Sequence, residues 1–220
     1  TTITLGRYEF NSTTGVESAY SGVFVEEDAN QTSTLKNYGN TIAKNITNFK
    51  NSVSANGGYY IGRYEARTAT ARSTAGNALT QITEKGTENV YNYVTQLQAA
   101  QLSQNMYNSN KFTSDLMNSY AWDTAIVFIQ NCGTNSKYSI QSSLNTSLSQ
   151  TGTTEDIQCN IYDMASNIQE WITETSDNSR DSCVYRGGTS YISRYYTSSR
   201  HCYDTYISFE EIGFRPLLYL

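Results

Sequence analysis

A polar, aromatic segment near the C-terminus constrains the fold more than any other feature of the chain. Its 21 residues, Thr189 to Phe209, are almost all Tyr, Ser, Thr and Arg, and their spacing follows neither a helical nor a strand period. The segments Arg186-Gly187-Gly188 and Ile212-Gly213-Phe214-Arg215-Pro216 flank it. We expect the two glycines of the first to allow a tight approach of backbones and the arginine of the second, Arg215, to bond to backbone carbonyls. Because this composition offers few apolar residues for a core, we predict a scaffold formed elsewhere that presents the segment at its surface.

The overall composition is consistent with one folded domain. Of 220 residues, 38% are hydrophobic and 19 are Tyr, and a tyrosine can bury its ring while its hydroxyl stays in water. The net charge is −5, and no basic run is present that could replace the counterions of a nucleic acid. No apolar stretch approaches the roughly 20 residues of a membrane helix. We therefore expect a soluble domain that neither binds nucleic acid nor inserts into a membrane.

Apolar residues at helical spacing predict three helices. The first starts with Thr32 or Ser33 as its cap, stops at Asn56-Gly57-Gly58, and places six residues on one face: Leu35, Tyr38, Ile42, Ile46, Phe49 and Val53. The second is predicted over about 89–107 and the third over about 114–131. Alternation predicts a half-buried strand over 58–66, and polar composition predicts loops over 67–87 and 133–157. Helices followed by strands and long loops indicate an α+β domain.

Five segments, in the same order along the chain, resemble the formylglycine-generating-enzyme (sulfatase-modifying factor) family. Gly57 to Glu65 resembles its opening strand, and Ser119 to Asp123 resembles its Trp-bearing second helix. Ile161 to Trp171 resembles its Gly-Asn-Val-Trp-Glu-Trp segment, but Ser166 replaces the Gly and Gln169 replaces the first Trp. The last two matches are Arg186-Gly187-Gly188 and Ile212 to Arg215. The resemblance implies a C-type lectin-like fold over 57–220, with two main helices packed on short irregular strands. Residues 1–56 would then form a strand and helix extension packed on the same domain.

The enzymes of this family use two cysteines shortly after the Arg-Gly-Gly landmark to bind copper. Soft thiolates are the ligands that Cu(I) requires, but the stretch from Thr189 to Thr197 contains no cysteine; Cys183 precedes the landmark and Cys202 lies further on. With Cys132 and Cys159, the spacings fit no zinc pattern, and the sequence does not fix a disulfide pairing. We therefore expect no enzyme activity, with an oxidase whose site is displaced as the alternative.

The same region also resembles the variable proteins of diversity-generating retroelements, which occur in bacteria and their phages. In those proteins, adenine-directed mutagenesis rewrites AAY codons near the C-terminus, and such changes never yield Lys, Glu, Gln, Met or Trp. These five residue types make up 34 of the other 199 residues and are absent from 189–209. The resemblance implies a hypervariable, non-enzymatic ligand-binding protein on a bacterial cell surface or a phage particle. A structural phage or cell-surface module is a further alternative.

The residue types of 189–209 suit a recognition surface. Tyrosine gives rigid contact area, and small polar residues give adaptable hydrogen bonds, as in antibody paratopes. The predicted ligand-binding residues, for a protein or glycan ligand, are Thr189, Tyr191, Ser193, Arg194, Tyr195, Tyr196, His201, Tyr203, Asp204 and Tyr206. Packing of these tyrosines against the scaffold is the alternative. No nucleophile elbow accompanies His201 and Asp204, so a catalytic triad is not expected.

The family resemblance also implies a calcium ion. Asp163 and Glu170, with the carbonyls of Ser166 and Ile168, match the positions at which the enzymes hold calcium, and carboxylates with carbonyls suit that ion. The alternative is that Glu170 accepts hydrogen bonds from nearby backbone amides without a metal. No cofactor is otherwise required. Trp122 and Trp171 are expected in the core.

Overall fold

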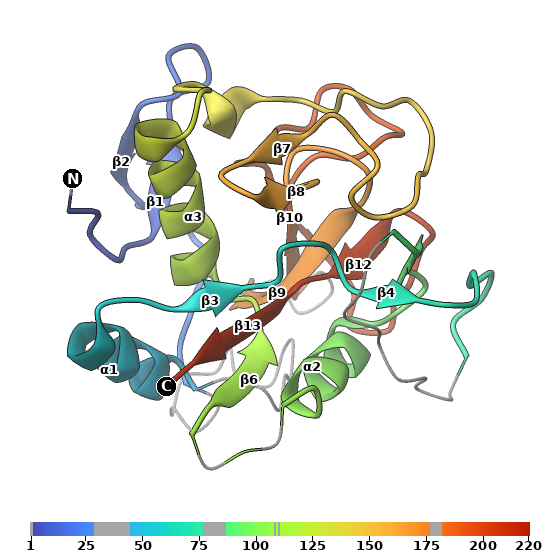
Figure 1. Cartoon of the computed structure of the whole chain (residues 1–220), viewed down its shortest axis with the longest axis horizontal. Coiled ribbons are helices and arrows are strands. Elements are labelled where there is room, and N and C mark those ends of the chain that lie inside the picture. The colour runs from blue at the N-terminus through green and yellow to red at the C-terminus, as the bar shows by residue number, and fades with distance from the viewer. Residues whose placement is uncertain (1, 29–44, 77–86, 108, 110, 177–181) are drawn as a thin grey trace.

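The computed structural model describes residues 2–28, 45–76, 87–107, 109, 111–176 and 182–220 (Figure 1). The helices are α1 (Ile46–Asn56), α2 (Gln96–Gln104), α3 (Ser119–Cys132) and a short 3₁₀ helix, η2 (Tyr138–Ile140). The strands are β1 (Tyr8–Phe10), β2 (Glu17–Ala19), β3 (Tyr60–Ile61), β4 (Arg67–Thr68), β5 (Asn89–Val90), β6 (Thr113–Leu116), β7 (Ile157–Gln158), β8 (Ile161–Tyr162), β9 (Gln169–Thr175), β10 (Cys183–Arg186), β11 (Arg200–Tyr203), β12 (Ile212–Phe214) and β13 (Pro216–Tyr219). Among the described residues, no helix is long and apolar enough to cross a membrane.

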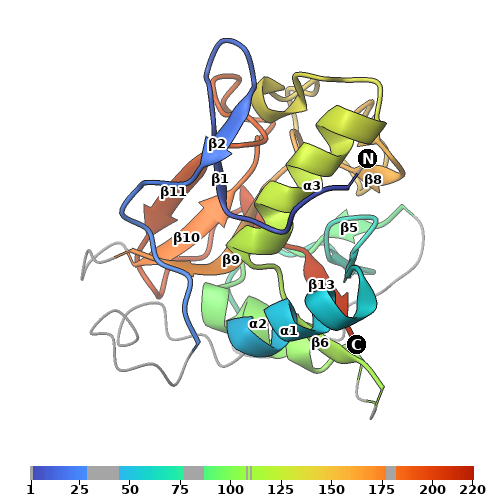
Figure 2. The ribbon, with the colours of Figure 1, turned by 90° about the vertical axis from the view of Figure 1, so that its left-hand side faces the viewer.

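The largest sheet has the order β11-β10-β9-β12, and β12 runs parallel to β9 while the other pairs are antiparallel. Side chains alternate between its faces: Trp171 packs with the apolar residues of α2, and Ile172 packs with those of α3. The two helices accordingly lie on opposite sides of β9 (Figures 1 and 2). Both faces of the central strand are therefore buried.

Short strands complete the molecule. β13 is the centre of a three-stranded sheet, β3-β13-β6, and three two-stranded ladders pair β1 with β2, β4 with β5, and β7 with β8. The mixture of three α-helices with several small sheets confirms the α+β prediction. The predicted strand over 58–66 is shorter than expected, because only Tyr60 and Ile61 pair with β13 as β3.

The described first helix begins later than predicted. α1 starts at Ile46, where the side chain of Asn45 accepts a hydrogen bond from the backbone nitrogen of Asn48, a common N-terminal cap. The predicted start at Thr32 or Ser33 lies outside the described residues. The predicted stop is confirmed, because Gly57 takes a left-handed conformation with φ of 77°.

The other two helices are also shorter at their N-termini than predicted. Thr95 and Gln98 form a capping box that starts α2 at Gln96, so residues 89–90 form β5 instead. Asn118 caps α3 by accepting a hydrogen bond from the backbone nitrogen of Ala121, and residues 113–116 form β6, which pairs with β13. In both places a short strand precedes the helix, and its apolar residues continue the helical spacing by chance.

Candidate ligand-binding surface at residues 189–209

The segment 189–209, called the display segment below, leaves the sheet at a close contact between backbones. Gly187, at the end of β10, has φ of 92°, and a Cβ on it would lie 2.8 Å from the carbonyl oxygen of Met164. A Cβ on Gly188 would lie 1.9 Å from the carbonyl oxygen of Ala165. Only glycine fits at such distances. The predicted role of these two glycines, a tight approach of backbones, is confirmed.

Buried hydrogen bonds fix the middle of the display segment. The indole Nε1 of Trp122 donates to the carbonyl oxygen of Thr197 at 3.1 Å, and the backbone nitrogen of Thr197 donates to Gln141 O at 2.9 Å. Ser198 N donates to Ser139 O at 3.0 Å. Trp122 is fully buried, as predicted for a core residue. Its position in α3 therefore sets the course of the display segment.

β11 is the part of the display segment that joins the sheet, beside β10 (Figure 2). A buried network of ion pairs holds it in place. Asp123 accepts from Arg186 at 2.6 Å and from Arg200 at 2.9 Å, and Glu174 accepts from Arg200 at 2.7 Å and also from Arg7. Burial opposes the charged form of Arg200, but Asp123 and then Glu174 outweigh it and raise the pKa of its guanidinium. β11 is thus fixed from beneath by charge-assisted hydrogen bonds.

The sequence reasoning missed this network. Asp123 is fully buried although it lies among the apolar residues of α3, and a carboxylate at such a position requires a cationic partner. That requirement could have been read from the helical spacing. The identity of the partners could not, because Arg186 and Arg200 are 63 and 77 residues away.

Most predicted ligand-binding residues reach the surface. Tyr191, Tyr196, Tyr203 and Tyr206 are 42%, 37%, 37% and 73% exposed. Ser193 and Arg194 are also exposed, and Tyr195, His201 and Asp204 are partly exposed. Thr189 is a correction: its side chain is fully buried, and its hydroxyl accepts a hydrogen bond from Tyr191 N at 3.4 Å, so it supports the segment from below.

Part of this surface is an aromatic cluster. The ring of His201 lies 4.4 Å from that of Tyr195 and 5.7 Å from that of Tyr185, and Tyr203 lies 6.4 Å from Tyr185 and 5.3 Å from Phe209 (centroid distances). Tyr185 contacts the core residue Trp171. The surface rings therefore rest on a rigid base, which limits the entropy lost when a ligand binds.

The environment of His201 favours the neutral form of its imidazole. Burial, followed by the nearby Arg186 and Arg194, lowers the pKa of its imidazole. Its ring contacts the rings of Tyr185 and Tyr195. A neutral imidazole packed between tyrosines gives the surface an apolar patch beside the exposed Arg194.

The predicted calcium residues are bonded to protein donors. Arg215 donates to both carboxylate oxygens of Glu170, at 2.7 and 3.1 Å, and both residues are buried. Asp163 accepts hydrogen bonds from Gly152 N at 2.7 Å and from the Thr154 hydroxyl. Ser166 and Ile168 are buried in the same turn. A guanidinium at Glu170 puts a positive charge where the cation would bind, so these residues fit calcium poorly. The alternative was that Glu170 accepts hydrogen bonds from nearby backbone amides; its carboxylate pairs with the side chain of Arg215 instead.

We expect calcium removal to leave thermal stability unchanged. A ligand that binds only the native state at 100 times its Kd adds about 2.7 kcal/mol to the free energy of unfolding, which a melting curve resolves easily. The measurement compares Tm in EGTA with Tm after calcium is restored in excess. A fall in Tm in EGTA that calcium reverses would show that Asp163 and Glu170 do bind the ion.

No protein-family model, curated protein or solved structure matches the chain.

Proposed function

We propose that the chain is a non-enzymatic ligand-binding protein with a C-type lectin-like fold of the formylglycine-generating-enzyme type. Its display segment would carry the diversified surface of a retroelement variable protein, on a bacterial cell or a phage. The ligand would be a protein or a glycan. One observation carries the proposal. Within 189–209, buried hydrogen bonds and ion pairs fix the backbone, while other side chains of the same segment are exposed and free to contact a ligand.

The buried anchors use groups that sequence variation at the exposed positions would not disturb. Thr197 is held through its backbone by Trp122 and Gln141, and Gly187 and Gly188 lie outside the varied segment. The exposed side chains of Tyr191, Arg194, Tyr196 and Tyr206 are not needed for those contacts. A surface of this kind can change its side chains while its backbone keeps its course.

The exposed chemistry suits a macromolecular ligand. Tyrosine and arginine are the residues that most often dominate the binding energy of interfaces, and Tyr206 and Arg194 are both exposed. The guanidinium of Arg194 lies 5.8 Å from the centre of the Tyr195 ring, a cation–π arrangement. The rings offer stacking faces to a sugar or a side chain, and the arginine offers hydrogen-bond donors to either.

The DNA beside the coding sequence tests diversification directly. A near-copy of the codons for 189–209, differing from them at adenines and adjacent to a reverse transcriptase gene, is the expected finding. Substituted codons should fall at exposed positions such as Tyr191, Arg194 and Tyr206, and not at the glycines before the segment. A complete locus without such a copy would refute the diversified surface.

A copper oxidase is the second candidate, and the cysteine positions decide where its site could lie. Cys183 and Cys202 pack into different core clusters on opposite faces of the sheet, so they do not form a ligand pair. Cys159 lies beside the end of α3: its Sγ is 3.2 Å from where a Cβ on Gly133 would be. Burial, and then the neighbouring thiol of Cys132, raises the pKa of Cys159. These two thiols are the better candidate pair.

We expect no formylglycine when the protein is incubated with copper, oxygen and a cysteine-containing sulfatase peptide. Burial raises the pKa of the Cys159 thiol, which favours its protonated form, whereas Cu(I) requires thiolates. Mass spectrometry of the peptide gives the result. Turnover that is lost in Cys132→Ala or Cys159→Ala, and kept in Cys202→Ala, would establish the oxidase with a displaced site.

A further inference from the structure

Two of the four cysteines lie beside each other at the end of α3. Cys132 is the last residue of α3, and its side chain is exposed. Cys159 lies in the turn between β7 and β8, and its Sγ is 3.2 Å from where a Cβ on Gly133 would be. The thiol of Cys159 is therefore next to the residue that follows Cys132. Both residues are thiols.

The two segments that carry these cysteines run side by side. Thr134 Oγ1 donates a hydrogen bond to Gln158 Oε1 at 3.3 Å, and the same amide oxygen lies 3.2 Å from the Cβ position of Gly133. These contacts join the residues after Cys132 to the residue before Cys159. A disulfide joins Cα atoms about 4.4–6.8 Å apart, which is the separation of adjacent chain segments.

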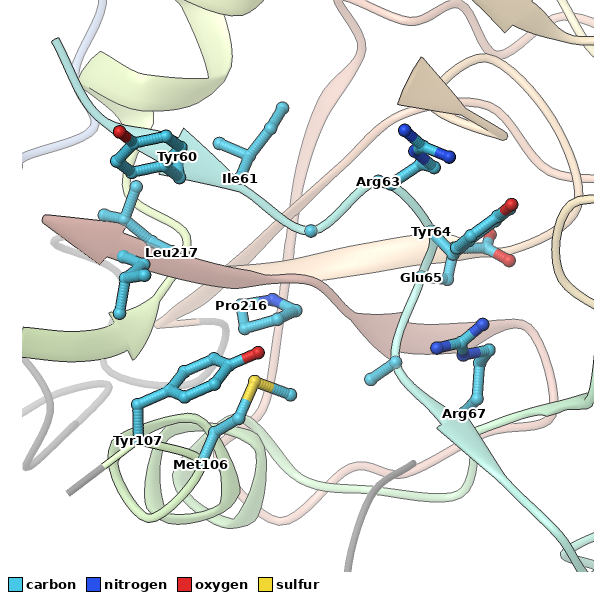
Figure 3. A pocket seen from close by; sticks show the side chains of 13 residues that line it. Tyr60, Ile61, Arg63, Tyr64, Glu65, Arg67, Met106, Tyr107, Pro216 and Leu217 are labelled. Atoms are coloured by element: carbon cyan, nitrogen blue, oxygen red, sulfur yellow. The ribbon is translucent and has the colours of Figure 1, made fainter. Parts of the chain in front are cut away.

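The hairpin of β7 and β8 is held from its other side, and this fixes the position of Cys159. Tyr162 N donates to Arg63 O at 2.9 Å, and the ring of Tyr162 lies 4.7 Å from that of Tyr64 (centroid distance). Figure 3 shows the side chains of Arg63 and Tyr64, in the stretch after β3, directed away from α2. The exposed side chain of Cys132 is therefore the one that has to turn for the two sulfurs to meet.

The other two cysteines are neighbours in the sheet but do not form such a pair. In the ladder of β10 and β11, Cys183 lies opposite Tyr203, and Cys202 lies opposite Val184. Successive residues of a strand point to opposite faces, and the two cysteines accordingly pack into different core clusters. Side chains on opposite faces of a sheet cannot be bridged without movement of the backbone. They provide an internal control.

The loop from Cys132 to Cys159 supports the display segment. Two backbone carbonyls inside this loop accept hydrogen bonds from the display segment: Gln141 O from Thr197 N at 2.9 Å, and Ser139 O from Ser198 N at 3.0 Å. A cross-link that closes a loop lowers its conformational freedom. A bond between the two cysteines would therefore steady the backbone on which the display segment rests.

We propose that Cys132 and Cys159 form a disulfide under oxidising conditions, and that this bond closes the loop beneath the display segment. The oxidant is a disulfide such as oxidised glutathione. The thiolate of the exposed Cys132 attacks one sulfur of the oxidant, and one glutathione thiolate leaves; the thiolate of Cys159 then attacks the Cys132 sulfur and releases the second. The protein loses two protons and two electrons, which convert the oxidant into two thiols. The pairing does not depend on the function proposed for the display segment.

Peptide mapping of the whole chain identifies the pair. The protein is oxidised with glutathione disulfide, unfolded with an alkylating agent present, and digested with trypsin, which cuts between the four cysteines at Lys137, Arg180 and Arg186. Mass spectrometry without reduction should find one cross-linked pair of peptides, containing Cys132 and Cys159, and should find the other two cysteines alkylated.

Serine variants assign the two steps. Cys159→Ser should leave Cys132 as a mixed disulfide with glutathione, because the second thiol is missing. Cys202→Ser is the matched control and should leave the link unchanged. Neither Cys132 nor Cys159 is buried, so serine at either position should allow folding.

Two further measurements report the effect of the link. The oxidised chain should melt about 5–10 °C above the reduced chain, and this difference should disappear in Cys132→Ser. Amide hydrogen exchange at Thr197 and Ser198 should be slower in the oxidised chain, because local opening is rarer when the supporting loop is closed.

Three results would overturn the proposal. One is a natural chain in which Cys132 stays bound to glutathione and no cross-linked pair forms. Another is a link between Cys183 and Cys202 in place of the expected one. The third is a cross-linked chain whose Tm and exchange at Thr197 and Ser198 equal those of the reduced chain, which would mean that the bond does not steady the loop.

Discussion

Replacing Trp171 or Phe214 by alanine is expected to lower the free energy of unfolding by about 3–5 kcal/mol. Both side chains are fully buried. The ring of Trp171 contacts Tyr185, its Nε1 donates to Val94 O at 2.8 Å, and Phe214 packs against Tyr91. Alanine at either position would leave a cavity between α2 and the sheet, and at Trp171 it would also leave the Val94 carbonyl without its donor. Urea unfolding curves measure the loss.

Serine substitutions at four tyrosines of the display segment form the comparison series. Tyr196→Ser and Tyr206→Ser should stay within about ±0.5 kcal/mol, as at other surface sites. Tyr195→Ser and Tyr203→Ser remove ring contacts with His201 and Phe209, so about 0.5–1.5 kcal/mol is expected. If all four cost as much as Trp171→Ala, the segment is part of the core and the display surface is wrong.

Local sequence patterns predicted the parts of the fold that local interactions determine. The stop of α1 at Gly57 depends on one left-handed residue, and the contacts of Gly187 and Gly188 depend on a missing Cβ. The start of α2 was also present in the sequence, since Thr95 and Gln98 have the spacing of a capping box. The helical spacing that continued upstream of it obscured that signal.

Features formed between distant segments could not be predicted in the same way. β6 is a strand because β13, about one hundred residues further along, pairs with it; without that partner, its one apolar residue, Leu116, continues the apolar spacing of α3. β11 is a strand because β10 pairs with it and because Asp123 and Glu174 hold Arg200. Thr189 was expected at the surface because its residue type resembles that of its neighbours, but the turn after Gly188 buries it.

Arg215 makes one kind of contact that the sequence predicted and one that it did not. Hydrogen bonds from Arg215 to backbone carbonyls were predicted, and they are confirmed at Gly62 O and Tyr162 O, at 2.8 and 2.7 Å. The contact with Glu170 was not foreseen, because the resemblance directed attention to a metal. Arg215 is also surrounded by Glu65 and Asp163, and although burial opposes its charge, Glu170 and then these groups raise the pKa of its guanidinium.

Arg215→Met is therefore expected to destabilise the fold by about 3–5 kcal/mol. Removing one partner of a buried ion pair leaves the other charge without compensation, and here two backbone carbonyls also lose a donor. Arg63→Gln is the control, because Arg63 follows the neighbouring strand β3 but is exposed; it should change stability by no more than about 0.5 kcal/mol. Equal effects of the two substitutions would contradict the role given to Arg215.

The double variant Glu170→Gln with Arg215→Met separates charge from hydrogen bonding. Neutralising Glu170 removes the uncompensated charge, so the double variant should be more stable than Arg215→Met alone, yet less stable than the natural chain because Gly62 O and Tyr162 O still lack their donor. The pH dependence should agree. Without Arg215, burial raises the pKa of Glu170 in the folded state above its unfolded value, so the folded state binds the proton more tightly. The deficit of Arg215→Met should therefore shrink as the pH falls through that raised pKa, and it should shrink less in the double variant, in which only Glu65 and Asp163 still lack the neighbouring guanidinium.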